Sequence, residues 1–218
     1  MIQIQPDITS EKELQIIAAT GSLVKVIGIK ALTLEDIAID MGISKKTIYQ
    51  FFNGKTELIE CAVSDFIRQK KEALREARLF SSNAVEHAFL GWHVLQEFLQ
   101  TINHEVSEEL RKHYTQGFYV VSEFLDVFLY NSFKLNIETG ITQQLFRNNI
   151  KAEIIARYLV QVVLLSRNIP MLSSGKFGYI ETEDQILSYH LHAIATEKGA
   201  RLIRKYKNEL IAHTAHLR

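Results

Sequence analysis

The chain of 218 residues has only one cysteine, Cys61, and two prolines. A single cysteine excludes an intramolecular disulfide and the paired-cysteine motifs of zinc and redox sites. Because there are only two prolines and ten glycines, few residues break helices, which argues against turn-dense all-β folds. The composition therefore favours long helices, and Cys61 is expected to be a buried helical thiol rather than a nucleophile.

The sequence also lacks net charge and long apolar runs. Its 25 lysines and arginines balance 25 aspartates and glutamates, which excludes a uniformly basic nucleic-acid binder but allows a local basic patch. The longest apolar run, Tyr158 to Leu165, is interrupted by Gln161 and is far shorter than the roughly 20 residues that span a bilayer. The first residues do not have the basic start and apolar core of a signal peptide. We therefore expect a cytoplasmic protein that does not enter a membrane.

Motifs for catalysis and metal binding are missing as well. The eight histidines do not occur as ligand pairs on one helix face, and the sequence contains no G-x-S-x-G, P-loop or G-x-G-x-x-G. No pair of carboxylates stands at a usable spacing. We predict no metal, no cofactor and no enzyme activity, with an all-α enzyme whose site lies in a helical bundle as the alternative.

Capping motifs and apolar periodicity predict helices along almost the whole chain. Three short helices begin near Ser10, Thr33 and Ser44, and a long helix runs from about Lys55 to Arg78. Further helices are expected at about 83–102, 105–114, 118–135, 150–167, 182–195 and 200–213, with a loop at 169–180. The prediction is an all-α fold with two domains. Residues 1–54 form an N-terminal domain, and residues 55–218, which begin with the long helix, form a helical bundle.

Residues 33 to 52 have the spacing of a helix-turn-helix. Ala38 is small enough for two helices to cross, Gly42 tolerates a positive φ in the turn, and Ile48 is placed to lock the pair. The second helix directs outward a set of donors suited to phosphates and base edges: Ser44, Lys45, Lys46, Thr47, Tyr49 and Gln50. Residues 42–56 contain three lysines and no acid, as a DNA-facing helix would in a neutral chain. On spacing alone, the alternative is a solvated amphipathic helix pair.

Three runs in this region carry a resemblance: Thr33-Leu-Glu-Asp-Ile-Ala38, Met41-Gly-Ile-Ser-Lys45 and Thr47-Ile-Tyr-Gln-Phe-Phe-Asn-Gly-Lys-Thr-Glu-Leu58. Together they resemble the signature of the tetracycline-repressor (TetR) family of bacterial transcription regulators. The spacing of Tyr49, Phe52, Lys55 and Leu58 is specific to that family. The resemblance covers about residues 10–60, and beyond them only the architecture is similar. Gly54 departs from the Ser or Asn that often stands there, so Asn53 is expected to take over the cap.

The resemblance implies a function for these side chains. Thr33 and Tyr49 would contact phosphates, and Lys55 would add its charge at a helix N-terminus. The residues that would face the major groove or its walls are Ser44, Lys45, Lys46, Thr47 and Gln50. The implied protein is a DNA-binding regulator, most often a repressor, whose partner is double-stranded DNA.

Aromatic residues concentrate in the second part of the chain. Taken alone, the sequence favours plain core packing for them, whereas the resemblance implies a mainly apolar pocket for an unknown small-molecule effector. The candidate lining residues are Phe89, Trp92, Phe118, Phe124 and Phe128, and Phe98 and Phe133 belong to the same aromatic group. A DNA-binding regulator with a closed core and no effector is the alternative.

One helix-turn-helix makes too few contacts for tight specific binding, so a homodimer on a palindromic operator is expected. The helix at 150–167 has apolar residues on more than one face, which a lone bundle would not need. With the helix at 182–195, it would form a four-helix interface between two copies. The candidate interface residues are Ile154, Tyr158, Val162, Leu187, Leu191 and Ile194.

Overall fold

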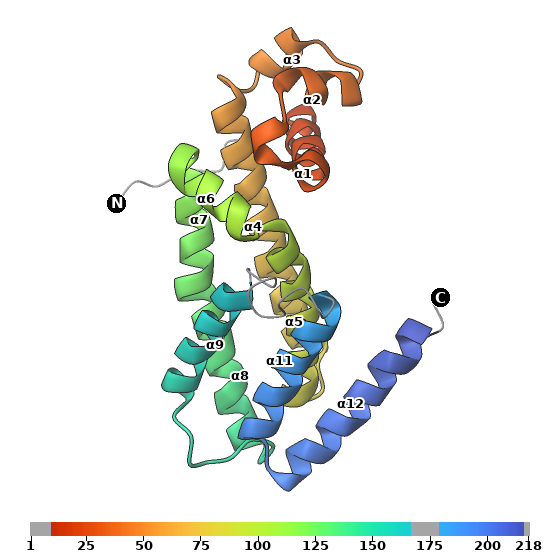
Figure 1. Cartoon of the computed structure of the whole chain (residues 1–218), viewed down its shortest axis with the longest axis vertical. Helices are drawn as coiled ribbons and strands as arrows, with labels where there is room; N and C mark the ends of the chain where they lie inside the picture. Colours follow the sequence, from red (N-terminus) through yellow and green to blue (C-terminus); the bar gives the residue numbers. More distant parts are fainter. Residues whose placement is uncertain (1–9, 167–178, 216–218) are drawn as a thin grey trace. The chain divides into compact units, whose positions relative to one another are not determined.

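The computed structural model describes residues 10–166 and 179–215, and these residues form an all-α fold (Figure 1). The first helices are α1 (Glu11–Ala31), α2 (Leu34–Asp40), α3 (Lys45–Tyr49) and α4 (Lys55–Phe80). The next are α5 (Ala84–Thr101), α6 (His104–His113), α7 (Thr115–Glu123), the π-helical turn η1 (Phe124–Leu129) and α8 (Tyr130–Thr142). The last are α9 (Ala152–Ser166), α11 (Tyr179–Ile194) and α12 (Glu197–Ala215). The predicted fold class is confirmed.

The predicted helix starts at Thr33, Ser44 and Asn83 are confirmed by their caps. Thr33 and Asp36 form a reciprocal capping box, with a Thr33 N to Asp36 Oδ2 distance of 2.8 Å. The Ser44 hydroxyl accepts a hydrogen bond from the Thr47 amide at 3.1 Å, and Asn83 accepts from two amides of α5. Each such cap contributes about 1 kcal/mol to the stability of its helix.

Other predicted boundaries need correction. A cap at Thr182 is wrong, because α11 already runs from Tyr179 and Thr182 lies within its first turn. The single helix expected at 118–135 is divided among α7, η1 and α8. Gly28 lies within the bounds of α1, but its φ of 78° breaks the helical conformation at the predicted point. The loop expected at 169–180 lies outside the described residues up to position 178.

The chain divides into two compact units. The first comprises Met1–Gln69 with Glu105–Ser122, and the second comprises Lys70–His104 with Glu123–Arg218. This division differs from the sequence-based boundary at 54/55, because α6 and α7 pack with the N-terminal helices. The Gln116 amide of α7 donates to Glu60 of α4 at 2.9 Å, and Gly117 lies beside Val63 of α4, where an added Cβ would be in ordinary contact at 3.7 Å.

The core of the first unit is built around the helix-turn-helix. Its largest fully buried side chains are Ile16, Leu32, Ile37, Ile48, Leu58, Ile59 and Ile67. By length and composition alone, α1 would pass as a membrane span. Ile16 and Ile29 are nevertheless buried in this core, and Gly28 interrupts the helix, as expected for a helix of a folded domain.

In the second unit, the turn between α8 and α9 packs tightly against α8 and against the start of α12. The ring of Phe146 occupies the place where a side chain on Gly140 would stand, since a Cβ there would lie 2.1 Å from its Cδ2. A Cβ on Gly199 would lie 2.1 Å from the carbonyl oxygen of Leu145. That same oxygen accepts a hydrogen bond from the Thr196 amide at 2.9 Å. The start of α12 is therefore fixed to this turn.

Candidate nucleic-acid interface and effector site

The crossing of α2 and α3 has the geometry that the sequence predicts. Gly42 has a φ of 62°, and the amide of Ile43 donates to the carbonyl of Ala38 at 2.9 Å. Ala38 is buried at the crossing, and Ile37 and Ile48 are fully buried beneath it. Burial of one such aliphatic side chain stabilises the fold by about 1.5–3 kcal/mol, so the pair is firmly held.

The outward face of α3 and its flanks carries the predicted DNA-binding residues. Ser44, Lys45, Lys46, Tyr49 and Gln50 are exposed, and Thr47 is half-buried. The hydroxyls of Ser44 and Thr47 lie 3.0 Å apart at the start of α3, while Thr33 caps α2. The hydroxyls of Thr33 and Ser44 thus cap α2 and α3 in the free protein, and the Thr47 hydroxyl contacts that of Ser44.

The three lysines of the basic segment have different surroundings. Lys45 forms an ion pair with Glu35 of α2 at 2.7 Å, and this hydrogen bond and charge raise the pKa of Lys45. Lys55 donates from Nζ to the carbonyl of Lys30 at 3.2 Å. Lys46 is exposed and has no carboxylate within 4.0 Å among the described residues. It is therefore the least engaged cation of the segment.

The residue that caps the start of α4 is Gly54, and not Asn53 as the sequence predicts. The carbonyl of Gly54 accepts the hydrogen bond of the Leu58 amide at 3.2 Å, which makes Gly54 the capping residue. Asn53 donates from its backbone and its side-chain amide to Glu57, at 2.6 and 2.8 Å. Asn53 is thus a donor to Glu57 and does not accept from the helix, and the Glu57 carboxylate complements the positive end of the α4 dipole.

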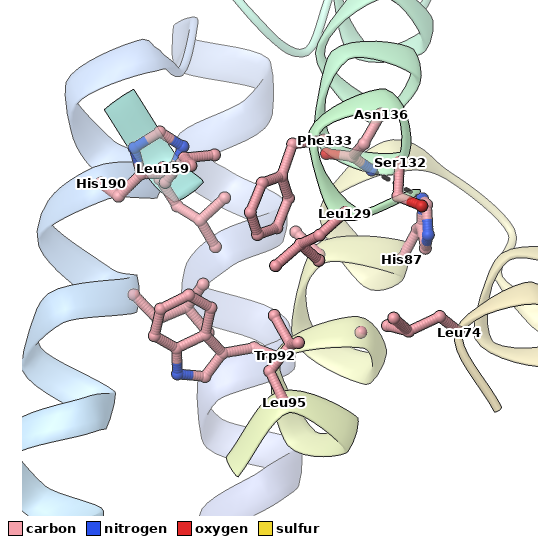
Figure 2. Close-up of a pocket in the computed structure, with 14 residues that line it drawn as sticks. Leu74, His87, Trp92, Leu95, Leu129, Ser132, Phe133, Asn136, Leu159 and His190 are labelled. Carbon is pink, nitrogen blue, oxygen red and sulfur yellow. Dashed lines mark hydrogen bonds between the residues drawn. The ribbon is translucent and has the colours of Figure 1, made fainter. Parts of the chain in front are cut away.

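The second unit contains a small apolar cavity, here called the inner cavity, of about 40 Å³ (Figure 2). Its apolar lining comes from five helices and η1 and includes Leu74, Trp92, Leu95, Leu129, Phe133, Leu159, Leu187 and Leu191. Its polar lining is His87, Ser132, Asn136 and His190. Trp92 is the sole tryptophan of the chain, and its indole N–H has no hydrogen-bond acceptor among the described residues.

A larger hollow, here called the outer hollow, has a volume of about 310 Å³. It shares Leu74, His87 and Ser132 with the inner cavity, so these three residues lie at the boundary of the two spaces. The rest of its lining is Arg75, Arg78, Glu123, Val127, Phe128, Asn131 and Leu135. A third, polar hollow of about 120 Å³ is also bordered by His87 and Arg78.

The two histidines of the inner cavity are neutral at neutral pH. Burial, with a smaller contribution from Arg78, lowers the pKa of His87 to about 4. Burial alone lowers the pKa of His190 to about 4. The Asn136 side-chain nitrogen donates to the carbonyl of Ala84 at 2.9 Å and lies 2.8 Å from His87 Nδ1 (Figure 2).

The predicted aromatic residues are spread over different surroundings. Trp92 lines the inner cavity, as Phe133 does, and Phe128 lines the outer hollow. Phe124 is fully buried and packs between Phe98 and Phe128, with ring centroids 5.0 and 5.8 Å away. Phe89 contacts the ring of Tyr206 in α12, and Phe118 belongs to α7 in the first unit. The arginines and His87 were not among the predicted lining residues, because no local motif marks them.

The predicted interface residues fall into two groups. Ile154 is 62% and Tyr158 51% exposed on α9, with half-buried Val162 following at helical spacing. Leu187, Leu191 and Ile194 are instead buried in the chain's own core, so they have little surface for a partner and this part of the prediction needs correction. On α11, the side chain of Tyr189 is 75% exposed.

Within the described ranges, no three His, Cys, Asp or Glu side chains lie close enough to hold a metal ion. Cys61 is half-buried in α4 rather than buried, and burial raises the pKa of its thiol. A thiol with a raised pKa forms little thiolate at neutral pH, so Cys61 is poorly suited to act as a nucleophile.

Comparison with known proteins agrees with the helix-turn-helix. Residues 16–62 match the family described as bacterial regulatory proteins, tetR family. The uncharacterized HTH-type transcriptional regulator YvaF of Bacillus subtilis is 28% identical over 112 residues, or 51% of this chain. The match spans 58% of the length of YvaF.

Solved structures show the same fold at low sequence identity. A transcriptional regulator from Cytophaga hutchinsonii has a TM-score of 0.71 and 17% identity, over 86% of this chain and 100% of its own. The regulator FadR from Bacillus subtilis, in complex with stearoyl-CoA, has a TM-score of 0.56 and 15% identity, over 83% of this chain and 98% of its own. Residues 16–62 therefore form a helix-turn-helix domain of the tetR family of bacterial regulatory proteins, and the described chain shares its fold with the solved regulators above.

Proposed function

We propose that the protein is a cytoplasmic, homodimeric repressor that binds palindromic double-stranded DNA through α3 and leaves it when a small, mainly apolar effector binds. The observation that carries DNA binding is the exposed face of α3, which presents Lys45, Lys46 and Gln50 on a buried, capped helix pair. Such a face offers donors to phosphates and base edges, and the fixed core gives them a defined orientation.

Salt-dependent binding to random and operator DNA tests this proposal. Lys46→Ala should weaken binding to both and lower the log-log salt slope by about one unit for the lost phosphate contact. Lys112→Ala, at an exposed lysine on α6, is the charge-matched control and should leave the slope unchanged. If Lys46 reads a base, its loss should relax specificity at one position, whereas unchanged binding to all DNA would remove α3 from the interface.

Two features support the effector response: the inner cavity is apolar, and α4 contributes to its lining. Leu74 of α4 lines both the inner cavity and the outer hollow, and α4 continues without a break from Lys55. FadR, of the same fold, holds stearoyl-CoA in its solved structure. A ligand that prefers one position of α4 changes DNA affinity by its differential binding energy, about 1–3 kcal/mol or 5- to 150-fold in a typical case.

A regulator with a closed core is the second candidate, and the small size of the inner cavity favours it. A volume of about 40 Å³ holds on the order of three water molecules. Titration of apolar compounds with Trp92 fluorescence as the readout, followed by DNA binding with and without the best ligand, separates the two. Quenching of Trp92 together with weaker DNA binding supports the effector response, and no response from any compound favours the closed core.

A further inference from the structure

The outer hollow has an excess of positive charge. Glu123 is the one carboxylate in its lining, and it is neutralised by Lys71, whose Nζ lies 2.5 Å from Glu123 Oε2. Arg75 forms an exposed pair with Glu72 at 3.1 Å, a kind of pair that contributes little. Arg78 has no carboxylate within 4.0 Å among the described residues. One full positive charge therefore stays uncompensated beside this hollow.

Phe128 holds two of the cations in place. The Nζ of Lys71 lies 5.6 Å from the centroid of its ring, and the guanidinium carbon of Arg75 lies 5.3 Å from it. Such cation–π contacts restrict the side chains without using their N–H groups. The donors of Arg75 that do not contact Glu72 stay available to a ligand in the outer hollow.

His87 adds a donor at the boundary of the inner cavity and the outer hollow. A backbone carbonyl can only accept, so the atom of Asn136 that contacts Ala84 O at 2.9 Å is the amide nitrogen. The same nitrogen lies 2.8 Å from His87 Nδ1 and donates to it (Figure 2). The neutral ring must then carry its proton on Nε2. His87 thus presents an N–H, and not a lone pair, with its second nitrogen.

The π-helical turn η1 lies at the same place. It supplies Val127 and Phe128 to the outer hollow and Leu129 to the inner cavity. Single π-helical turns are rare and occur frequently at functional sites, because the extra residue redirects side chains. The backbone irregularity and the cationic lining thus mark one location.

We propose that the ligand of this site is a small amphiphilic carboxylate whose head group is bound by Arg78 and Arg75 in the outer hollow and whose apolar end passes His87 into the inner cavity. This inference rests on the proposed effector response and specifies its chemistry. Carboxylate oxygens accept from guanidinium and imidazole N–H groups, while an ammonium head would face like charge. The leucine-rich lining around Trp92 accommodates only the end of an alkyl chain or a small ring.

The experiment compares three probes with the same alkyl chain, octanoate, 1-octanol and octylamine, titrated into the full-length protein with Trp92 fluorescence as the readout. Octanoate should bind about tenfold more tightly than octanol, as expected for a charge-assisted contact, and octylamine more weakly than both. In Arg78→Gln, this preference for octanoate should vanish while octanol binds as before. Arg111→Gln, at an exposed arginine of the first unit, is the matched control and should keep the preference.

Several outcomes would overturn the inference: no octanoate binding, equal binding of octanoate and octanol, or an unchanged preference in Arg78→Gln. Retained octanol binding shows that the variant is folded, and Arg75→Gln, which should lower the preference in part, serves if Arg78→Gln does not fold. DNA binding separates the two proposals. Arg78-dependent octanoate binding that leaves DNA affinity unchanged keeps this site but refutes the effector response. Octanol that weakens DNA binding without any octanoate preference does the reverse.

Discussion

Lys45 of α3 and Glu35 of α2 form an ion pair, with 2.7 Å between Nζ and Oε2. Their side chains are 53% and 55% exposed, so the pair lies at the surface of α3 that we propose binds DNA. A phosphate that approaches Lys45 must compete with the Glu35 carboxylate. Under the proposed binding of DNA by α3, Glu35 of α2 therefore lowers the affinity of the free protein for DNA.

We predict that Glu35→Gln increases affinity for DNA. The substitution frees Lys45 and removes a negative charge, and exposed pairs of this kind contribute up to about 1 kcal/mol, or about a fivefold change in affinity. The measurement is fluorescence anisotropy of labelled DNA. In a double-mutant cycle, Lys45→Ala should cost more affinity in the Glu35→Gln background than in the unchanged protein.

Asp40→Asn is the control for this prediction, because it removes the same charge from an exposed position of α2. An equal gain in both variants would assign the effect to general charge rather than to the pair with Lys45. Weaker binding in Glu35→Gln would contradict the competition altogether.

The exposed apolar stripe of α9, formed by Ile154, Tyr158 and the half-buried Val162, allows a test of the proposed dimer interface. Tyr158→Glu places a carboxylate where an apolar contact between two copies is expected, so the variant should be monomeric at micromolar concentration by light scattering. Tyr119→Glu makes the same chemical change at a 64% exposed residue of α7 and should stay dimeric. A dimeric Tyr158→Glu protein would exclude this stripe as the interface.

Gly140→Ala should destabilise the second unit, because its Cβ would meet Phe146 at 2.1 Å. Overpacking of this kind costs about 1–3 kcal/mol of the free energy of unfolding, which urea denaturation measures. Gly21→Ala, in α1 with no atom within 4 Å of the added Cβ, should instead stabilise by about 0.5–1 kcal/mol. If Phe146→Leu does not relieve the loss in Gly140→Ala, the steric explanation fails.

The lowered pKa values of His87 and His190 lead us to predict that the protein loses stability at mildly acidic pH. Burial lowers the pKa of each ring from 6.5 to about 4, so between these values the unfolded chain binds protons that the folded protein does not. Their contribution is complete above pH 6.5 and is lost as pH falls toward 4. From pH 7.5 to 5.0, each ring should cost about 2 kcal/mol of unfolding free energy.

Urea denaturation at these two pH values checks the prediction. His190→Gln removes one titrating group, so its loss of stability between pH 7.5 and 5.0 should be smaller by about the same amount. His104→Gln, which changes a histidine of α6 outside the inner cavity, is the control and should keep the full loss of stability between these two pH values. The same pH dependence in His190→Gln and in the unchanged protein would show that His190 does not titrate in this window.

The helix-turn-helix could be predicted because its determinants are local. The caps at Thr33 and Ser44, the turn at Gly42 and the buried Ile48 lie within a few residues of one another, and each has a direct conformational effect. The ion pair of Lys45 with Glu35 depends on how two helices cross. Its acidic partner lies outside the acid-free segment that the sequence indicated.

The proposed effector site could not be predicted in detail, since Arg78, His87 and Asn136 come from three helices that meet only after folding. Apolar spacing also shows which residues share a helix face but not what covers that face. Leu187 and Ile154 are equally apolar, yet one is buried in the chain's own core and the other is exposed.

The close packing of Gly199 determines whether α12 can be removed from the chain. Gly199 brings α12 against the carbonyl of Leu145, Thr196 donates to that carbonyl, and Tyr206 of α12 accepts from Asn83 at the start of α5 at 2.8 Å. A protein truncated before Thr196 would leave this carbonyl and Asn83 without these partners and would uncover the surface beneath Ile203, which is fully buried. The last helix in the sequence is therefore an integral part of the second unit and not a removable C-terminal extension.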